Sequence, residues 1–575
     1  MLADRTRALL AGLLACAALG CGTALAQLPP AGSPLPYVTP PPSPGVAPPA
    51  APAPAPRPAP MPAVGVAVRS VAVEGATAYS RQQIEAVAHT GALVGPAVPL
   101  ARIEAARTAI LQLYRADGYV LSAVSVSIDA RGALRFLVTE GRIAAVKLSA
   151  DIGPAGTRVL KFLRHLTEKV PIDEATLERY LLLAQQVPGV TLHAVLQPVP
   201  GEPGAVNLIA EVSRAAISGL ATTDNYGASY AGPIETLAVL DLNSFTALGE
   251  KTEISLYHTW ANSQTFGQAS SEVFLGDSGL RLHVYGGDGQ TVPTGPLSVE
   301  GYVGVTTVFG LGLTYPLLLS RSENLTLAGN LDAIDSQVSV LADGQRGRES
   351  ADSLRIARIS ADYARSDVLL GPSRSAVNTL AVRLSQGITE LGASDAESSL
   401  LPRTGEDPQF TKVDARVSRT QTLFSPWQGA SVALYGMVAG QFTNNTLPPA
   451  EEFYLGGLQY LRGYELGAIT GDTALTSTIE LQFNTSLDLS ALALPDPVPV
   501  QFYGFYDWGE VWQHNPDSYD VRAASTGIGV RLTATTHAEV DFLAAARLNR
   551  YPAGGGSNVS ALNAGTFLWR VLTRF

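Results

Sequence analysis

Two charged residues stand in unusual settings late in the chain. Arg462 lies between two long strand-like segments, in the stretch Leu461-Arg462-Gly463-Tyr464, which follows the glycine-containing stretch Phe453-Tyr454-Leu455-Gly456-Gly457. Asp507 occupies the middle of an aromatic strand-like stretch, Phe505-Tyr506-Asp507-Trp508-Gly509. A guanidinium and a carboxylate that meet can form a two-pronged ion pair. The hypothesis is that Arg462 and Asp507 contact each other; the alternative leaves Arg462 solvated at a loop surface.

Other residues with chemical potential do not form catalytic or ligand-binding patterns. Gly276-Asp277-Ser278-Gly279 is similar to the nucleophile loop of some serine proteases, but Leu280 stands where glycine is expected, and we interpret the stretch as a tight turn between strands. The seven histidines are scattered without the spacing of a metal site. No glycine-rich loop carries the lysine needed to bind phosphate. The sequence predicts no enzyme, no cofactor and no metal site.

The composition limits the partners that the chain can have. The 575 residues are 46% hydrophobic and only 15% charged, which excludes a mainly disordered chain. The net charge of −11 argues against a nucleic-acid partner, because no basic patch is available to neutralise phosphates. Beyond the first few dozen residues no run of apolar residues is long enough for a membrane-spanning helix. A membrane role therefore requires a closed β-barrel.

The first 64 residues resemble a leader followed by a spacer. Residues 1–26 have the layout of a secretory signal, with two arginines, an apolar stretch and Ala24-Leu25-Ala26 before Gln27. Both cysteines, Cys16 and Cys21, fall inside it, so they are not a disulfide framework; a rival interpretation makes Cys21 the first residue of a lipoprotein. Residues 27–64 are rich in proline and alanine, which predicts an extended linker without a core.

Residues 65–214 contain two repeats with the same predicted order, β-α-α-β-β. In the first repeat, residues 65–141, a strand covers Val66 to Val73, and Ser80 and Gln83 predict a capping box at the start of a helix. In the second repeat, residues 142–214, Asp173 is the predicted N-cap of a helix. Each repeat is large enough for a small sheet covered on one face by two helices. The open sheet edges are able to accept an extended guest strand.

Residues 215–575 alternate between apolar and polar side chains over many short segments. Ile479, Leu481 and Phe483, for example, alternate with Glu480, Gln482 and Asn484. Repeated alternation of this kind is typical of a transmembrane barrel with an apolar face toward lipid and a polar face toward a wet lumen, here with about 16 strands. The last strand carries Trp569 and Phe575 on one face, and its final aromatic is typical of outer-membrane barrels.

The whole arrangement resembles the two-partner secretion transporters, the TpsB family of outer-membrane proteins. The repeats look like the family's paired periplasmic POTRA domains, joined here by Val138-Thr139-Glu140-Gly141-Arg142-Ile143. Leu461, Arg462, Gly463 and Tyr464 are similar to the family's V-R-G-Y motif on the sixth extracellular loop, with leucine in place of valine. Phe505, Asp507 and Gly509 are similar to its F-x-D-x-G strand motif.

This resemblance implies a pore of haemolysin secretion/activation type, with its POTRA domains in the periplasm of a Gram-negative bacterium. It implies a large secreted exoprotein with an N-terminal secretion domain as partner (an adhesin, haemagglutinin or cytolysin), with outer-membrane lipid and the barrel-assembly machinery as further partners. The sixth loop, about residues 443–471, then folds into the lumen. There a guanidinium needs a carboxylate, so Asp507 is the predicted barrel-wall partner of Arg462, and Glu510 is the second candidate acceptor.

Two other functions remain open on the sequence alone, and one feature departs from the family. An outer-membrane assembly insertase would share the repeats and the Arg462 motif, whereas a passive diffusion porin would leave the repeats unused. Family members can carry an N-terminal helix that plugs the pore, but residues 27–63 are too rich in proline to form one. If the pore is closed at rest, the sixth loop or another loop has to contribute more to closing it.

Overall fold

The computed structural model describes most of the chain after the proline-rich tract. The described residues are 65–229, 231–294, 298, 301–342, 344–488, 497–515, 519–535, 537–550 and 562–575. The predicted signal sequence, both cysteines and the predicted linker lie outside this set. Contacts divide the described chain into two compact units, residues 65–216 with Asn243–Glu250, and Ile217–Leu242 with Lys251–Phe575. No helix in these ranges combines the length and the hydropathy needed to cross a bilayer.

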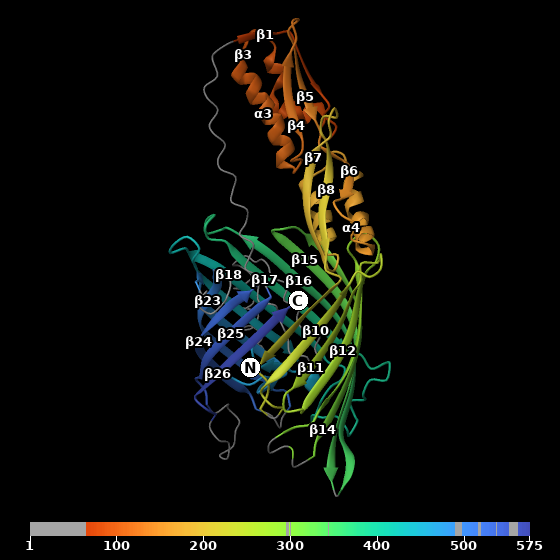
Figure 1. The fold of residues 1–575 in the computed structure, drawn as a ribbon, viewed down its shortest axis with the longest axis vertical. Coiled ribbons are helices and arrows are strands. Elements are labelled where there is room, and N and C mark those ends of the chain that lie inside the picture. The colour runs from red at the N-terminus through yellow and green to blue at the C-terminus, as the bar shows by residue number, and fades with distance from the viewer. Residues whose placement is uncertain are drawn as a thin grey trace. The chain divides into compact units, whose positions relative to one another are not determined.

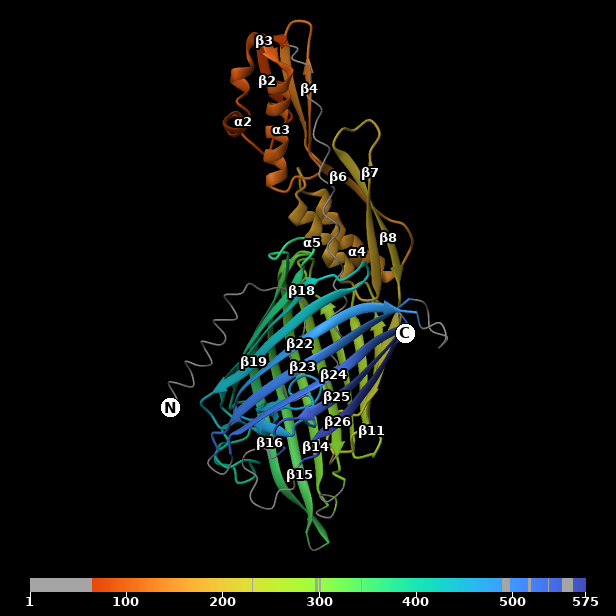
Figure 2. The ribbon, with the colours of Figure 1, turned by 90° about the vertical axis from the view of Figure 1, so that its left-hand side faces the viewer.

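The first repeat packs two helices on one face of a small sheet. Its elements are β1 (Gly65–Val68), β2 (Ser70–Glu74), α2 (Arg81–Ala88), a 3-10 turn (Thr90–Leu93), β3 (Gly95–Pro99), α3 (Leu100–Ala116), β4 (Ala123–Ile128) and β5 (Ala133–Thr139). The sheet has the order β2-β5-β4, and β2 runs parallel to β5. Ile84 and Ile110 from the helices pack with Leu134 and Phe136 from β5 in one core. Figure 2 shows the two helices side by side.

The single strand predicted for residues 66–73 is wrong in detail, because this segment forms two strands in different sheets. β1 pairs with β3 in a separate two-stranded sheet, whereas β2 pairs with β5. The Arg69 amide, between them, donates to the Gly132 carbonyl. β3 itself carries two prolines, a composition that argues against a strand in a sequence-based prediction. The predicted capping box at α2 is confirmed, since Ser80 and Gln83 bond reciprocally.

The second repeat shows the order β-α-α-β-β. It consists of β6 (Arg142–Leu148), α4 (Pro154–Arg164), a 3-10 turn (His165–Thr167), α5 (Glu174–Gln185), β7 (Val190–Pro198) and β8 (Ala205–Arg214). The sheet order is β6-β8-β7, so β7 hydrogen-bonds to β8 alone among the described strands. Asp173 caps α5 as predicted, accepting a hydrogen bond from the Thr176 amide at 2.7 Å.

The joint between the repeats depends on Glu140 and Gly141. The Glu140 carboxylate accepts hydrogen bonds from the Thr77 amide at 2.7 Å, the Ala78 amide at 2.9 Å and the Tyr114 hydroxyl at 2.7 Å. Burial alone would raise the pKa of Glu140, but these hydrogen bonds outweigh burial and lower its pKa below the ordinary value. A Cβ on Gly141 would lie 2.3 Å from the Leu121 Cβ, so only glycine fits at this junction.

Sixteen strands of the described chain form a closed antiparallel barrel, which confirms the predicted fold class (Figure 1). The strands in chain order are β9 (Ile217–Asp224), β10 (Glu235–Asn243), β11 (Lys251–Thr259), β12 (Gln264–Phe274), β13 (Arg281–Thr291), β14 (Val303–Leu319), β15 (Glu323–Ala342), β16 (Gln345–Asp367), β17 (Ala376–Gly387), β18 (Thr411–Phe424), β19 (Ser431–Thr443), β22 (Thr473–Leu487), β23 (Val498–Trp512), β24 (Val521–Thr535), β25 (Ala538–Arg547) and β26 (Gly565–Arg574). Each strand pairs with its neighbours in this order, and Figure 2 shows β22 to β26 side by side in one wall.

The last strand closes the barrel. β26 pairs with β9 from Arg570 opposite Asp224 to Arg574 opposite Leu220, and the Phe575 amide and carbonyl exchange hydrogen bonds with Gly219 at 3.1 Å each. Along β26 the even-numbered positions from Leu568 to Leu572 are buried, whereas Phe575 is 66% exposed. Trp569 and Phe575 therefore share the outward face, as the alternation in the sequence predicts.

Candidate functional site inside the barrel

The candidate site lies on the polar face of the barrel strands. On β22 the exposed Ile479 and Leu481 flank the buried Glu480, and on β23 the exposed Tyr506 precedes the buried Asp507. In a membrane barrel the apolar exposed positions face lipid, so the buried polar positions face the interior. Glu480 and Asp507 thus point into the barrel, on neighbouring strands.

The connection between β19 and β22, residues 444–472, is called the sixth loop here. It contains a 3-10 turn (Pro449–Glu451) and a two-stranded sheet of β20 (Phe453–Leu455) and β21 (Ile469–Gly471). Its tip carries Leu461, Arg462 and Tyr464, which are all buried. Because these side chains contact inward-facing residues of the barrel wall, the sixth loop folds into the barrel.

Arg462 contacts two carboxylates and is 6% exposed. Its Nη2 lies 2.9 Å from Asp507 Oδ1, its Nε donates to Asp507 Oδ2 at 3.0 Å, and its backbone amide donates to the same oxygen at 2.8 Å. Its Nη1 forms an ion pair with Glu480, which also accepts a hydrogen bond from Arg531 at 2.8 Å. The guanidinium is therefore compensated by charge and by hydrogen bonds on several sides, as a buried charge requires.

The other motif residues fit the loop tip to the wall. The Phe505 ring lies under the guanidinium, with 3.8 Å between the ring centroid and the Arg462 Cζ. Gly463 has φ +111°, and a Cβ there would lie 3.2 Å from the Cβ atoms of Ser525 and Ala545. A Cβ on Gly509 would come within 2.8 Å of the Leu455 side chain. Both glycines thus allow close packing of the loop against the strands.

Tyr464 extends this attachment to the next strands. Its hydroxyl donates to the Asn549 carbonyl at 2.7 Å and lies 3.2 Å from the Ala524 carbonyl. Backbone carbonyls of the tip are held as well, because Ser525 donates to the carbonyl of Arg462 and Arg547 donates to that of Gly463. The tip is consequently attached to β22, β23, β24 and their neighbour β25.

Glu510, the second predicted acceptor for Arg462, is a wrong prediction. Its carboxylate forms an ion pair with Arg522 at 3.0 Å, and the Arg522 side chain is 64% exposed. The reason is the two-residue period of a strand: Asp507 and Gly509 are on the buried face of β23, so Glu510 is on the opposite face. Glu480 is the second acceptor that the sequence reasoning missed. Its place on the polar face of an alternating strand was the signal that pointed to it.

The remaining motifs serve the architecture. Gly276–Gly279 forms the turn between β12 and β13, as predicted, with the Leu275 amide donating to the Leu280 carbonyl at 2.8 Å. Among the described residues, no group of three or more His, Cys, Asp or Glu side chains is placed to hold a metal ion. Trp569 also contacts the first strand's end, since its amide donates to Asn225 Oδ1 at 2.7 Å.

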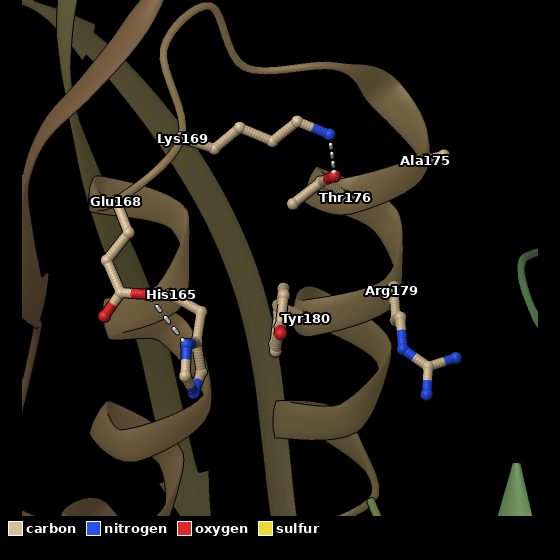
Figure 3. Close-up of a pocket in the computed structure, with 7 residues that line it drawn as sticks. All are labelled: His165, Glu168, Lys169, Ala175, Thr176, Arg179 and Tyr180. Atoms are coloured by element: carbon tan, nitrogen blue, oxygen red, sulfur yellow. Dashed lines mark hydrogen bonds and ion pairs between the residues drawn. The ribbon is translucent and has the colours of Figure 1, made fainter. Parts of the chain in front are cut away.

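A pocket of about 440 Å³ lies on the helical side of the second repeat (Figure 3). Its walls come from the turn that follows α4 and from α5. His165 stacks on Tyr180 with 4.8 Å between ring centroids, and its Nδ1 lies 3.1 Å from Glu168 Oε2. Lys169 donates to Thr176 Oγ1 at 2.9 Å and pairs with Asp173. These contacts join the two helices, and we assign the pocket a structural role.

Comparison with known proteins agrees with this architecture. A sequence model of the haemolysin secretion/activation proteins ShlB/FhaC/HecB matches residues 205–532, and a model of the ShlB-type POTRA domain matches residues 66–141. The barrel and the POTRA match together define an outer-membrane β-barrel transporter with periplasmic POTRA domains. The chain belongs to the ShlB/FhaC/HecB family and is a two-partner secretion transporter, which exports a large secreted partner protein.

Individual relatives are distant. The heme/hemopexin transporter protein HuxB of Haemophilus influenzae (strain 86-028NP) is 23% identical over 433 residues, 72% of this chain and 71% of HuxB. HuxB of the H. influenzae strain Rd is 22% identical over 434 residues, with the same coverage. The structure of CdiB from Escherichia coli matches with a TM-score of 0.70 at 19% identity, over 92% of this chain and 94% of CdiB. CdiB from Acinetobacter baumannii has a TM-score of 0.61 at 15% identity, over 90% and 91%.

A double-mutant cycle measures the coupling between Arg462 and Asp507. Breaking a buried ion pair costs about 3–5 kcal/mol, so the two alanine variants are expected to be strongly non-additive in the free energy of unfolding of the barrel. The measurement is urea unfolding of the purified protein, monitored by the loss of the folded band in electrophoresis. The exposed pair Arg522 and Glu510 is the matched control, with an expected coupling below about 1 kcal/mol. Additive effects at Arg462 and Asp507 would exclude an energetic contact.

Proposed function

We propose that the transporter binds an extended segment of its unfolded partner along the open edges of the repeat sheets. The carrying observation is the edge of β7, which has β8 as its sheet neighbour on one side and no described strand on the other. Val195 on β7 and Val126 on β4 are each 37% exposed. An edge strand with unpaired backbone groups and exposed apolar side chains is suited to accept a guest strand.

The sixth loop gives the second half of the proposal. Its tip lies inside the barrel and is attached to β22 and β23 through Arg462. We propose that the arriving chain displaces this tip, and that re-formation of the Arg462, Asp507 and Glu480 contacts returns it. Trp569 and Phe575, on the outward face of the closing strand, are the proposed recognition residues for assembly of the barrel itself. The proposed domain limits are 65–141, 142–214 and 215–575.

Site-specific photo-crosslinking tests the capture step. A photo-reactive phenylalanine at Val195 of β7, or at Val126 of β4, is expected to crosslink to the secreted partner in cells that express both proteins. The same photo-reactive residue at Lys161, an exposed position on the helix α4 and not on an edge strand, is the matched control and is expected to give no product. Equal crosslinking from Lys161 and Val195, or none from either edge, would contradict capture by strand addition.

A further inference from the structure

The base of the sixth loop is held by a second set of buried charges. Glu451 near the loop's beginning and Asp472 at its end are both 0% exposed. We use the name base clamp for these two residues and the side chains that hold them. Its members are Glu451, Asp472, Arg358, Lys412, Arg403 and Gln441. None of them belongs to the motif around Arg462.

Glu451 is bound by two cations from separate strands. Arg358 on β16 approaches it as a fork, with Nη2 at 2.8 Å from Oε1 and Nη1 at 3.1 Å from Oε2. Lys412 on β18 lies 3.0 Å from Oε2 and also donates to the Glu451 carbonyl at 2.8 Å. Arg358 is fixed in turn by Asp332 at 2.6 Å, and Asp332 accepts a hydrogen bond from Tyr285 at 2.9 Å. The loop's beginning is thereby tied to β13, β15, β16 and β18.

Asp472 attaches the loop's end to Arg403, in the segment before β18, and to the loop's own beginning. Its Oδ1 lies 2.7 Å from Arg403 Nη1 and accepts a hydrogen bond from the Leu447 amide at 2.7 Å. Gln441 on β19 joins the two ends, because its Nε2 donates to the Glu451 carbonyl at 3.2 Å and to the Asp472 carbonyl at 2.9 Å. The two ends of the inward segment are therefore held together as well as held in place.

The segment between Glu451 and Asp472 has its own secondary structure. β20 and β21 lie within it and pair with each other, with Phe453 opposite Gly471 and Leu455 opposite Ile469. Gly456 and Gly457 follow β20, and Gly467 precedes β21, all with positive φ. Beyond these glycines lies the tip with Arg462, whose partners are on β22 to β25. The carboxylate partners of the tip lie on β22 and β23, whereas the cations that bind Glu451 lie on β16 and β18. Apolar side chains of the tip and of β20 and β21 pack in one cluster, which includes Leu461, Tyr464, Leu455 and Ile469.

We propose that the sixth loop is an arm with a fixed base, and that Glu451 is the positioning residue that keeps this base in the barrel when Arg462 is released. This inference rests on the proposed displacement of the tip. Losing Asp507 and Glu480 frees residues 456–468, whereas β20 and β21 stay in place because the base clamp is intact. Release of the whole loop requires the loss of both attachments. Loss of the base attachment is costly, because it leaves Arg358 and Lys412 buried without the Glu451 carboxylate.

Spin labels distinguish the two ends of the arm in the purified full-length transporter without any partner protein. The chain has no cysteine after Cys21, so an introduced cysteine is the only thiol in residues 27–575. One label replaces Leu466, on the tip, and the other replaces Tyr454, on β20; both side chains are exposed. In Arg462→Ala, the Leu466 label is expected to become mobile, with a roughly twofold or greater drop in its rotational correlation time, while the Tyr454 label does not change.

Glu451→Gln reverses this pattern. It is expected to mobilise the Tyr454 label, and the double variant Arg462→Ala with Glu451→Gln is expected to mobilise both. Glu349→Gln, an exposed position on the same strand as Arg358, is the matched control and should change neither spectrum. If Glu451→Gln does not fold, Lys412→Met removes one cation and keeps the Arg358 fork, with the same expected direction for the Tyr454 label.

Two results would overturn the proposal. In the first, Arg462→Ala alone mobilises the Tyr454 label as much as Glu451→Gln does. The loop would then behave as a single rigid body. In the second, neither Glu451→Gln nor Lys412→Met increases the mobility of the Tyr454 label. Because these spectra need no partner, they stand apart from the crosslinking test: absent crosslinks contradict strand capture and leave the base clamp as measured.

Discussion

Replacing Arg462 with alanine is expected to abolish secretion of the partner protein while leaving a folded, heat-modifiable barrel in the outer membrane. The substitution removes the donor of the hydrogen bonds to Asp507 and Glu480 and leaves these carboxylates without their shared cation. The loop tip then loses its defined position, although the strands keep their backbone ladders. The measurement is the amount of partner in the medium, with heat-dependent electrophoretic mobility to report the folded barrel.

Two further variants make this result specific. Arg462→Lys keeps a positive charge but lacks the fork that contacts Asp507 at two atoms, so it is expected to lose most of the secretion as well. Arg522→Ala removes an exposed arginine paired with Glu510 on the other face of the same wall, and secretion is expected to continue. Normal secretion by Arg462→Ala would remove the proposed role of the loop tip.

Much of the barrel was predictable from the sequence because the physics of a membrane strand is local. Every strand must place an apolar side chain toward lipid at alternate positions, so the pattern around Ile479 and Leu481 identifies a strand without knowledge of its neighbours. The even strand number followed from the length of the region and was confirmed. The same two-residue alternation along β23 places Asp507 and Glu510 on opposite faces of the strand. Counting alternate residues from Asp507 would have avoided the wrong acceptor.

The rest of the site depends on contacts between residues far apart in the chain. Glu451 meets Arg358 across a separation of 93 residues, and Arg403 meets Gln513 across 110. No local pattern marks such partners: Arg358 is one polar residue on an alternating strand, whereas Glu451, Arg403 and Gln513 lie outside the barrel strands. The first repeat gives a similar lesson on a smaller scale: the valines of residues 66–73 predict extended backbone, but the division into β1 and β2 is set by their different partners, β3 and β5.

The base clamp bears on the prediction that residues 27–63 form no plug helix. These residues lie outside the described part of the chain. The sixth loop, in contrast, is attached at its tip by Arg462 and at its base by Glu451 and Asp472. Two separate attachments allow the tip to move without loss of the loop from the barrel. We expect the loop to carry the main barrier to passage through this pore.

The second large effect is expected from removal of the transporter itself. A two-partner secretion transporter serves one secreted protein, whereas an insertase of the same superfamily serves many barrels. Deleting the gene for this chain is therefore expected to remove one large protein from the medium and to leave the abundance of other outer-membrane proteins unchanged. Re-expression of the intact chain restores the secreted protein, and re-expression of Arg462→Ala does not.

Quantitative proteomics of the outer membrane and the medium, with and without the transporter, tests this account most directly. We expect the loss of a single large secreted protein, with other barrels at their usual levels. A general decrease of outer-membrane barrels, with no specific loss from the medium, would contradict secretion of one partner and would favour an assembly insertase instead.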